Sequence, residues 1–241
     1  MASIQRDKVV SFSIFGDNLK YINGLLHNYE AMKQHFPGWQ MAVFYDSTCP
    51  KWLPELFGDL KLARTFDMTN LPLNKMMWRF FVSSFWVLDL ERFIVRDADS
   101  RLSERDALVV EAWEKSRKRL HIIRDHPSHT SLIMGGLWGF VQEDIDAHLF
   151  FQNGLRFCAE NPIHMTSYSA DQLFLERIYH TFRNDLLVHA AFNKYEQEAE
   201  DFPSKRKNYE FLGEVCDMEG NPVGVREAIG LFESTGTGNS T

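Results

Sequence analysis

The chain has 241 residues with 26 basic and 33 acidic side chains, a formal net charge of -7, and 44% of its residues are hydrophobic. This length and apolar content suffice for one sizeable core, so the composition excludes a largely disordered chain. The acidic balance argues against a dedicated nucleic-acid-binding protein. We expect a folded enzyme or binding domain.

Taken in chain order, short apolar runs alternate with amphipathic segments, which is typical of an α/β domain. The expected strands cover residues 8–15, 40–45, 60–66, 92–96, 120–124, 132–140 and 186–189. The expected helices cover residues 19–36, 74–86, 103–116 and 170–182. We expect one domain over residues 1–232 and a flexible tail at 233–241, where glycine, serine and threonine predominate.

Cysteine usage and the lack of long apolar runs bear on location. The three cysteines, Cys49, Cys158 and Cys216, lie far apart without CxxC spacing. This pattern argues against disulfides and structural zinc and favours a reducing compartment. The first ten residues do not read as a signal peptide, and no apolar run reaches the about 20 residues of a membrane span. We expect a cytoplasmic protein.

The sharpest local signal is the pair Asp97 and Asp99, directly after the apolar strand at 92–96. Carboxylates at i and i+2 of an extended backbone face the same side, and strand ends border the ligand crevice of open α/β sheets. Such a pair suits a hard divalent cation that also binds phosphate oxygens. The alternative is an ordinary turn. A second pair, Asp144 and Asp146, is expected on a polar surface helix.

Three segments carry a family resemblance: FIVRDADSRLSERD at 93–106, IIRDHPSHTSLIMGGLWGF at 122–140 and YSADQLFL at 168–175. Together they resemble GT-A-type glycosyltransferases, and more closely the small nucleotide-sugar-dependent enzymes with which chlorella viruses glycosylate their capsid protein. The resemblance implies a GT-A-like domain with a mixed, mostly parallel sheet flanked by helices. For a viral enzyme it implies the host cytosol as the location.

The resemblance also implies a donor site. In GT-A enzymes a UDP-sugar lies over the end of the first strand, and Mn²⁺ or Mg²⁺ is held by the aspartate pair. A late histidine often completes the metal ligands, and His189 is the best positional match; the alternative is a structural histidine. The donor-binding residues implied in this sequence are Phe12, Ser13, Phe15, Gly16, Asp46, Lys75, Arg79, Asp97, Ala98, Asp99, Gly135 and Gly136.

The chemistry of sugar transfer gives these residues roles. Negative charge develops on the leaving nucleoside diphosphate, and a bound cation stabilises it. Arg79 offers a bidentate contact to phosphate or sugar, with Lys75 as a weaker candidate; a solvated helix arginine is the alternative. Gly135 and Gly136 let the backbone approach the donor sugar closely, although a tight turn would look the same.

Two further sets of residues complete the expected site. Asp125, His126, His129 and Trp138 flank the glycine pair, and we expect them to contact the acceptor; a structural loop with Trp138 in the core is the alternative. Asp171, followed by Gln172, resembles the Asp-Gln pair of glycogenin-like retaining transferases. That likeness implies a catalytic Asp171 near the anomeric carbon. The alternative is a helix-start aspartate that only favours the helix dipole.

The sequence therefore predicts a hexosyl- or pentosyltransferase that takes a nucleotide-sugar donor and a glycan or glycoprotein acceptor. One rival is a sugar-1-phosphate nucleotidyltransferase, which normally has a glycine-rich basic loop after the first strand. Residues 15–18, Phe-Gly-Asp-Asn, contain one glycine and no basic residue, which disfavours it. A non-catalytic glycan-binding module of the same fold is the second rival.

Overall fold

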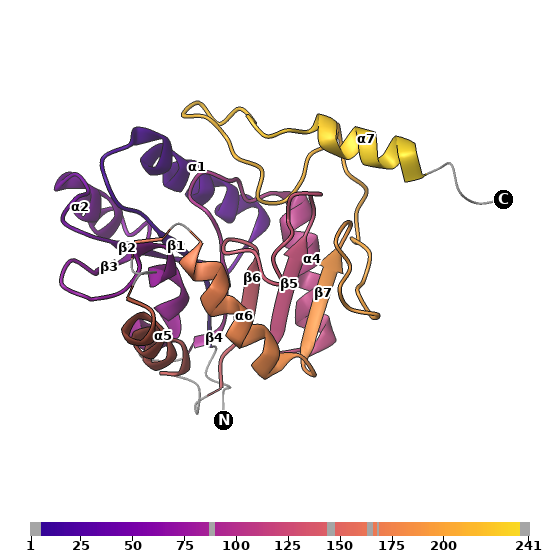
Figure 1. The fold of residues 1–241 in the computed structure, drawn as a ribbon. Coiled ribbons are helices and arrows are strands. Elements are labelled where there is room, and N and C mark those ends of the chain that lie inside the picture. The colour runs from indigo at the N-terminus through magenta and orange to yellow at the C-terminus, as the bar shows by residue number, and fades with distance from the viewer. Residues whose placement is uncertain (1–5, 87–89, 144–147, 163–165, 168, 237–241) are drawn as a thin grey trace, which may run out of the picture.

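The computed structural model describes residues 6–86, 90–143, 148–162, 166–167 and 169–236. Its strands are β1 (Asp7–Ser13), β2 (Trp39–Tyr45), β3 (Arg64–Asp67), β4 (Leu90–Val95), β5 (Leu120–Arg124), β6 (Trp138–Val141) and β7 (Leu186–Ala190). They form one sheet in the order β3-β2-β1-β4-β6-β5-β7 (Figure 1). Neighbouring strands are parallel except at β6, which runs antiparallel to both β4 and β5.

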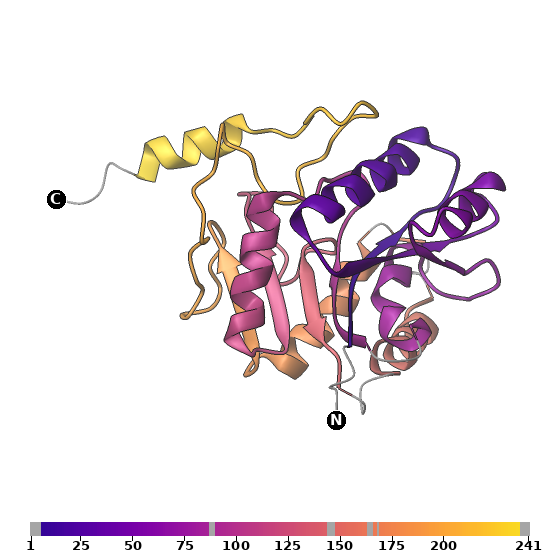
Figure 2. The same cartoon turned by 180° about the vertical axis from the view of Figure 1, so that it is seen from behind.

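Helices cover both faces of the sheet. They are α1 (Leu19–His35), α2 (Trp52–Asp59), the 3₁₀ helix η1 (Lys75–Phe81), α3 (Val82–Phe85), α4 (Glu104–Ser116), α5 (Leu149–Glu160), α6 (Ala170–Phe182) and α7 (Glu227–Gly236). Helices α1, α2 and α4 pack on one face, which is toward the viewer in Figure 2. η1, α3, α5 and α6 pack on the other face. The predicted α/β fold with a mixed, mostly parallel sheet is confirmed.

Several element boundaries differ from the sequence prediction. The segment 74–86 begins as a 3₁₀ helix and becomes α-helical only at Val82. Residues 131–137 form turns, so the predicted strand at 132–140 is limited to β6. Helix α7 extends to Gly236, so residues 233–236 of the predicted tail are helical. Its buried Ile229 anchors this helix, and Glu227 in the first turn complements the helix dipole.

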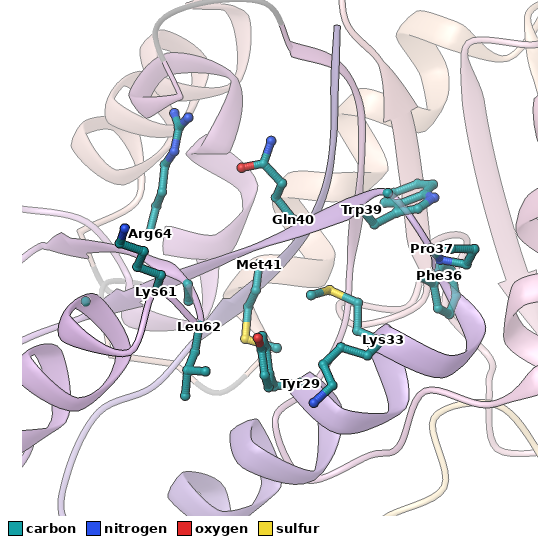
Figure 3. Close-up of a pocket in the computed structure, with 14 residues that line it drawn as sticks. Tyr29, Lys33, Phe36, Pro37, Trp39, Gln40, Met41, Lys61, Leu62 and Arg64 are labelled. Carbon is teal, nitrogen blue, oxygen red and sulfur yellow. The ribbon is translucent and has the colours of Figure 1, made fainter. Parts of the chain in front are cut away.

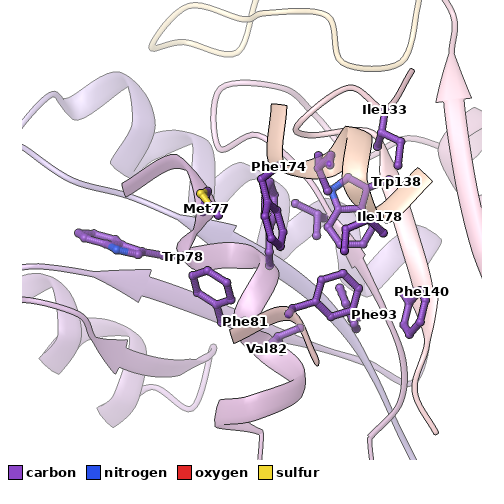
Figure 4. Packing of buried hydrophobic residues seen from close by; sticks show 14 of the residues in the cluster. Met77, Trp78, Phe81, Val82, Phe93, Ile133, Trp138, Phe140, Phe174 and Ile178 are labelled. Carbon is purple, nitrogen blue, oxygen red and sulfur yellow. The ribbon is translucent and has the colours of Figure 1, made fainter. Parts of the chain in front are cut away.

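The larger core cluster holds the elements that carry the site. Phe93 of β4 and Trp138 of β6 meet Phe174 of α6 and Phe81 of η1 in the packed region shown in Figure 4. Phe80 packs edge-on against Trp138, with ring centroids 5.2 Å apart. Burying such large aromatic side chains contributes strongly to stability. The core thereby fixes η1 and α6 relative to the end of β4.

Across the parts of the chain that the structure describes, no helix has both the length and the apolar character to cross a membrane. Cys49, Cys158 and Cys216 are all buried free thiols.

Candidate active site

A cavity of about 280 Å³ opens at the carboxyl ends of β1 and β4. The residues at the ends of both strands line it, together with side chains from α1, η1 and the segment between β7 and α7. We call this segment, residues 191–226, the C-terminal segment. The lining residues are Ser13, Ile14, Phe15, Tyr21, Met76, Arg79, Asp97, Ala98, Asp99 and Val215. The sequence-predicted aspartate pair, the end of the first strand and Arg79 therefore meet in one cavity.

Helix α1 fixes in place the segment after β4, residues 96–102, which we call the aspartate loop. Asn28 donates a hydrogen bond from Nδ2 to the Ser100 carbonyl at 2.8 Å and accepts one from the Leu102 amide at 2.9 Å. One turn earlier, a Cβ at Gly24 would overlap the carbonyl oxygen of Ala98. The sequence prediction missed both residues. A signal was present, because glycine and asparagine are poor helix formers and here lie four residues apart on one helix face.

Arg79 bridges two carboxylates. Its Nη1 donates a hydrogen bond to Asp97 Oδ1, and its Nη2 lies 3.6 Å from Asp171 Oδ2. The Arg79 side chain is buried, so the alternative of a solvated helix arginine is wrong. Its Nε is buried and donates to no acceptor in the described residues. Arg79 thus joins the aspartate loop to the start of α6.

Asp171 lies in the first turn of α6 and is itself buried. Burial raises the pKa of its carboxyl, while the charge of Arg79 opposes this shift. Gly135 and Gly136 pack against the two carboxylates: a Cβ at Gly135 would overlap Asp171 Oδ2, and one at Gly136 would overlap Asp97 Oδ2. The glycine pair therefore permits a close approach of backbone to carboxylate.

Two lysines pair with acidic residues at this edge of the sheet. Lys20 of α1 lies 2.8 Å from Asp99 Oδ2, a contact that the sequence prediction missed. Lys75 lies 2.5 Å from Asp46 Oδ2 and 5.4 Å from the ring centroid of Phe15. Burial alone would raise the pKa of Asp46, but hydrogen bonds from Lys75 and Thr48 lower it. Both lysines are therefore close to the cavity and held by carboxylates.

The carboxylates that line the cavity match part of a binding site for a divalent cation. Asp97 and Asp99 present hard carboxylate oxygens to the same cavity, which is the ligand type that Mg²⁺ and Mn²⁺ prefer. The described residues contain no group of three or more histidine, cysteine, aspartate or glutamate side chains arranged for a metal. Mg²⁺ is usually bound by one or two protein carboxylates, and water and phosphate oxygens fill its remaining coordination positions.

The structure does not bring His189 together with the aspartates. Its side chain is buried on the α4 side of β7, and its Nδ1 lies 2.9 Å from His121 Nε2. The ring of His121 in turn stacks on Trp113 of α4. Burial, with a smaller effect of the Arg105 charge, lowers the pKa of His189 to about 4. These contacts are those of a structural histidine.

The remaining donor-site residues are divided between cavity and core. Ser13 and Phe15 line the cavity, and the Gly16 amide donates a hydrogen bond to Thr48 Oγ1 at 2.8 Å. Phe12, by contrast, is fully buried in the second core cluster. Its side chain packs between the sheet and α1, so the predicted contact of this side chain with a nucleotide does not fit its position.

Three of the predicted acceptor residues are enclosed by other parts of the protein. Trp138 is fully buried in the core. Asp125 accepts hydrogen bonds from Arg105 and Arg206. His126 Nε2 lies 3.1 Å from the carbonyl oxygen of Val225. Side chains so enclosed have little room to contact an acceptor, and the contacts of Asp125 and His126 hold the C-terminal segment on the domain.

His129 is buried beside that network. Its Nδ1 accepts a hydrogen bond from the Asp125 amide at 3.1 Å, so the proton of the neutral ring is on Nε2. Burial and the neighbouring His126 lower the pKa of His129 to about 3, although the charge of Asp97 opposes them. The other aspartate pair, Asp144 and Asp146, lies outside the described residues.

Comparison with known proteins shows which fold this is. No protein-family model matches the chain, and no curated protein does. The solved structure of the glycosyltransferase GlyE from Streptococcus pneumoniae TIGR4 aligns with a TM-score of 0.50 at 13% identity, over 77% of this chain and 45% of GlyE. That of S. aureus TarS 1-349 aligns with a TM-score of 0.50 at 12% identity, over 77% of this chain and 58% of TarS.

The chain thus spans about half the length of these two structures. At such low identity the likeness establishes the fold, which is one found in glycosyltransferases.

Proposed function

We propose that the protein is a glycosyltransferase that moves a sugar from a UDP-sugar to a glycan or glycoprotein acceptor, with Mn²⁺ or Mg²⁺ as cofactor. The observation that carries the proposal is the convergence of Asp97, Asp99 and Arg79 on one cavity at the carboxyl end of β4, with Asp171 behind them. This is the edge at which open α/β sheets bind their ligands. The shared fold with a glycosyltransferase supports the reaction class.

The cavity offers a place for each part of the donor. The half-exposed ring of Phe15, which packs edge-on against Trp78, offers a face on which uracil can stack. Asp97 and Asp99 would hold the cation, and the cation would supply positive charge to the diphosphate. Arg79 lines the same cavity and would add positive charge beside a phosphate or sugar oxygen. Lys20 and Lys75 add positive charge to the same edge.

Asp171 is the proposed catalytic carboxylate. It is buried, it is oriented by the hydrogen bond from its neighbouring Gln172 amide to Oδ1, and it lies beside Arg79. A carboxylate held in this way can stabilise positive charge that develops at the anomeric carbon of a sugar. On the likeness of Asp171-Gln172 to retaining transferases, we propose retention of configuration and a hexose or pentose as the transferred sugar.

The resemblance to chlorella virus enzymes extends the proposal to the acceptor and the location. We propose a capsid-type glycan as the acceptor and the cytoplasm as the compartment of the reaction. His129 is the most suitable of the predicted acceptor residues, because its Nε2–H is a fixed donor and its ring lies within electrostatic reach of Asp97.

The proposal is tested by measuring UDP release from UDP-sugars with and without Mn²⁺, alongside UDP binding by calorimetry. We expect Mn²⁺-dependent binding and turnover, both lost in Asp99→Ala. Asp201→Ala is the matched control, since its carboxylate is exposed and pairs with Lys194 on the surface. Binding without turnover would identify a glycan-binding module instead. Pyrophosphate release from UTP and a sugar 1-phosphate would identify a nucleotidyltransferase.

A further inference from the structure

We propose that Val215, in the C-terminal segment, determines the nucleotide specificity of the cavity at Asp97 and Asp99, and that it limits this cavity to a pyrimidine nucleotide. The C-terminal segment crosses the carboxyl edge of the sheet, at the top of Figure 1. It brings Val215 into the lining of the cavity, with 36% of the residue exposed. None of the donor-binding residues expected from the sequence lies beyond Gly136.

Val215 begins a short antiparallel hairpin, residues 215–223. The Val223 amide donates a hydrogen bond to the Val215 carbonyl at 2.8 Å. Outside the hairpin, Arg226 donates two hydrogen bonds to the Glu214 carboxylate, at 2.5 and 2.6 Å. Glu214 is itself buried. These contacts fix the backbone on both sides of Val215.

The hairpin is also attached to the aspartate loop. The Cys216 amide donates a hydrogen bond to the Asp99 carbonyl at 2.7 Å, and Arg101 Nη2 donates one to the Asp217 carbonyl at 3.3 Å. A larger ligand that pushed Val215 outward would have to break such hydrogen bonds, and buried groups left without a partner are costly. Val215 is therefore a rigid part of the cavity wall.

The side chains that line the cavity indicate which part of a nucleotide Val215 contacts. The charged ones are Arg79, Asp97 and Asp99, and the large apolar ones are Ile14, Phe15, Tyr21, Met76 and Val215. A nucleoside diphosphate has the same division, because its diphosphate is charged and its base has apolar faces. The two aspartates would take the diphosphate with its cation, which leaves the apolar side chains for the nucleoside.

The size of the cavity favours a small base. Its volume of about 280 Å³ is at the lower limit of ordinary small-molecule sites. A purine has a second fused ring, which uracil lacks. In an apolar pocket a difference of one methylene group changes binding by about 10- to 200-fold, so the two methyl groups of a fixed valine suffice to discriminate. We expect the wild type to prefer UDP to GDP.

This role of Val215 rests on the proposed function, because it concerns the same donor site. A larger cleft, of about 600 Å³, lies beside the end of α1 and the start of β2 (Figure 3). Its lining, as far as the chain is described, includes no carboxylate that could hold the cation of a nucleotide. The exposed Lys61 of this cleft therefore provides a control for nucleotide binding outside the cavity at Asp97 and Asp99.

The test is calorimetric titration of the full chain with UDP, GDP and pyrophosphate, each in the presence of Mn²⁺. Val215→Ala should bind UDP about three- to tenfold more weakly, because two methyl groups are lost. It should bind GDP more tightly, so the preference for UDP should fall at least about tenfold. Pyrophosphate, which lacks the nucleoside, should bind as it does to the wild type, and this binding also shows that the variant is folded.

Two control variants should bind all three ligands as the wild type does. Val225→Ala removes the same methyl groups from an exposed valine of the same segment, and Lys61→Ala changes the cleft of Figure 3. Equal affinity of the wild type for UDP and GDP, or an unchanged preference in Val215→Ala, would overturn the role of Val215.

An equal loss of UDP and pyrophosphate binding in Val215→Ala would also overturn it, because Val215 would then only support the aspartate loop. Failure of the proposed function has a different appearance, since the wild type itself would bind neither UDP nor pyrophosphate with Mn²⁺. The role of Val215 would be rejected together with it. Where the wild type binds UDP, the variants decide on Val215 alone.

Discussion

Arg79 and Asp171 lie side by side in the interior, with Nη2 3.6 Å from Oδ2 and only 3% and 4% of their side chains exposed. Arg79 also donates to Asp97, so one guanidinium serves a carboxylate on the cavity wall and another behind it. In a water-poor setting such charges interact more strongly than on the surface. The position of Asp171 therefore depends on Arg79 and on the aspartate loop together.

Asp171→Asn should lower turnover on the order of 100-fold while the affinity for UDP changes little. The substitution keeps the size of the side chain but removes the charge that would act at the reacting sugar. The measurement is kcat beside the dissociation constant for UDP. Glu176→Gln, an exposed position on the same helix, is the control. Wild-type turnover in Asp171→Asn would reduce Asp171 to a helix-start residue.

Lys20→Ala should strengthen Mn²⁺ binding by about two- to fivefold. Lys20 lies 2.8 Å from Asp99 Oδ2 in a partly exposed pair, and such a pair is worth up to about 1 kcal/mol. A metal ion at Asp99 must compete with that ammonium group. Calorimetric titration with Mn²⁺ provides the measurement, with the exposed Lys51→Ala as control. Weaker Mn²⁺ binding by Lys20→Ala would contradict this competition.

Gly24→Ala should destabilise the protein by about 1–3 kcal/mol and weaken Mn²⁺ binding. Its new Cβ would overlap the Ala98 carbonyl, so the aspartate loop or helix α1 must move. Gly58→Ala is a matched control within helix α2, because nothing lies within 4 Å of its Cβ position. That control should be neutral or stabilising by about 0.5–1 kcal/mol.

Urea unfolding of Gly24→Ala and Gly58→Ala measures their stability, and titration with Mn²⁺ measures their metal affinity. Equal stability of the two variants would show that α1 does not fix the aspartate loop.

Stability should fall as the pH decreases from about 6.5 toward 4. Burial lowers the pKa of His129 to about 3 and that of His189 to about 4, from an ordinary value of 6.5. In this interval the unfolded chain binds protons that the folded protein does not. The free energy of unfolding therefore decreases with falling pH, by up to about 1.4 kcal/mol per pH unit for each histidine.

Urea titrations at about pH 7 and about pH 5 measure this loss. The variant His129→Asn, which removes one of these groups, should show a shallower dependence than the wild type. A free energy of unfolding that is the same at both pH values would contradict the burial of neutral histidines.

The sequence alone predicted the features that depend on local pattern. Apolar runs located the strands, and the position of Asp97 and Asp99 directly after one of them placed both at the carboxyl edge of the sheet, where the cavity lies. It did not predict that Lys20 and Asn28 would meet the aspartate loop, because these contacts join segments about 70 to 80 residues apart. Contacts of that kind depend on how α1 packs on the sheet.

The same reasoning explains why Asp125, His126 and His189, which the sequence predicted in the site, have structural contacts instead. Asp125 and His126 lie beside the glycine pair in sequence, but Arg206 and the Val225 carbonyl occupy their polar atoms. Nothing in the local pattern places a segment 80 or more residues away. His189 likewise follows an apolar run, yet strand alternation turns its side chain toward α4 and His121.

The reversed direction of β6 has a consequence for how this edge of the sheet is assembled. Parallel strands bring only the segments that follow them to the carboxyl edge, as β4 does with Asp97. Because β6 runs the other way, with Val95 paired to Trp138, it brings the segment that precedes it to that same edge. Gly135 and Gly136 belong to this segment. Had β6 been parallel, they would enter the sheet at the far edge, and the two carboxylates would face a different wall.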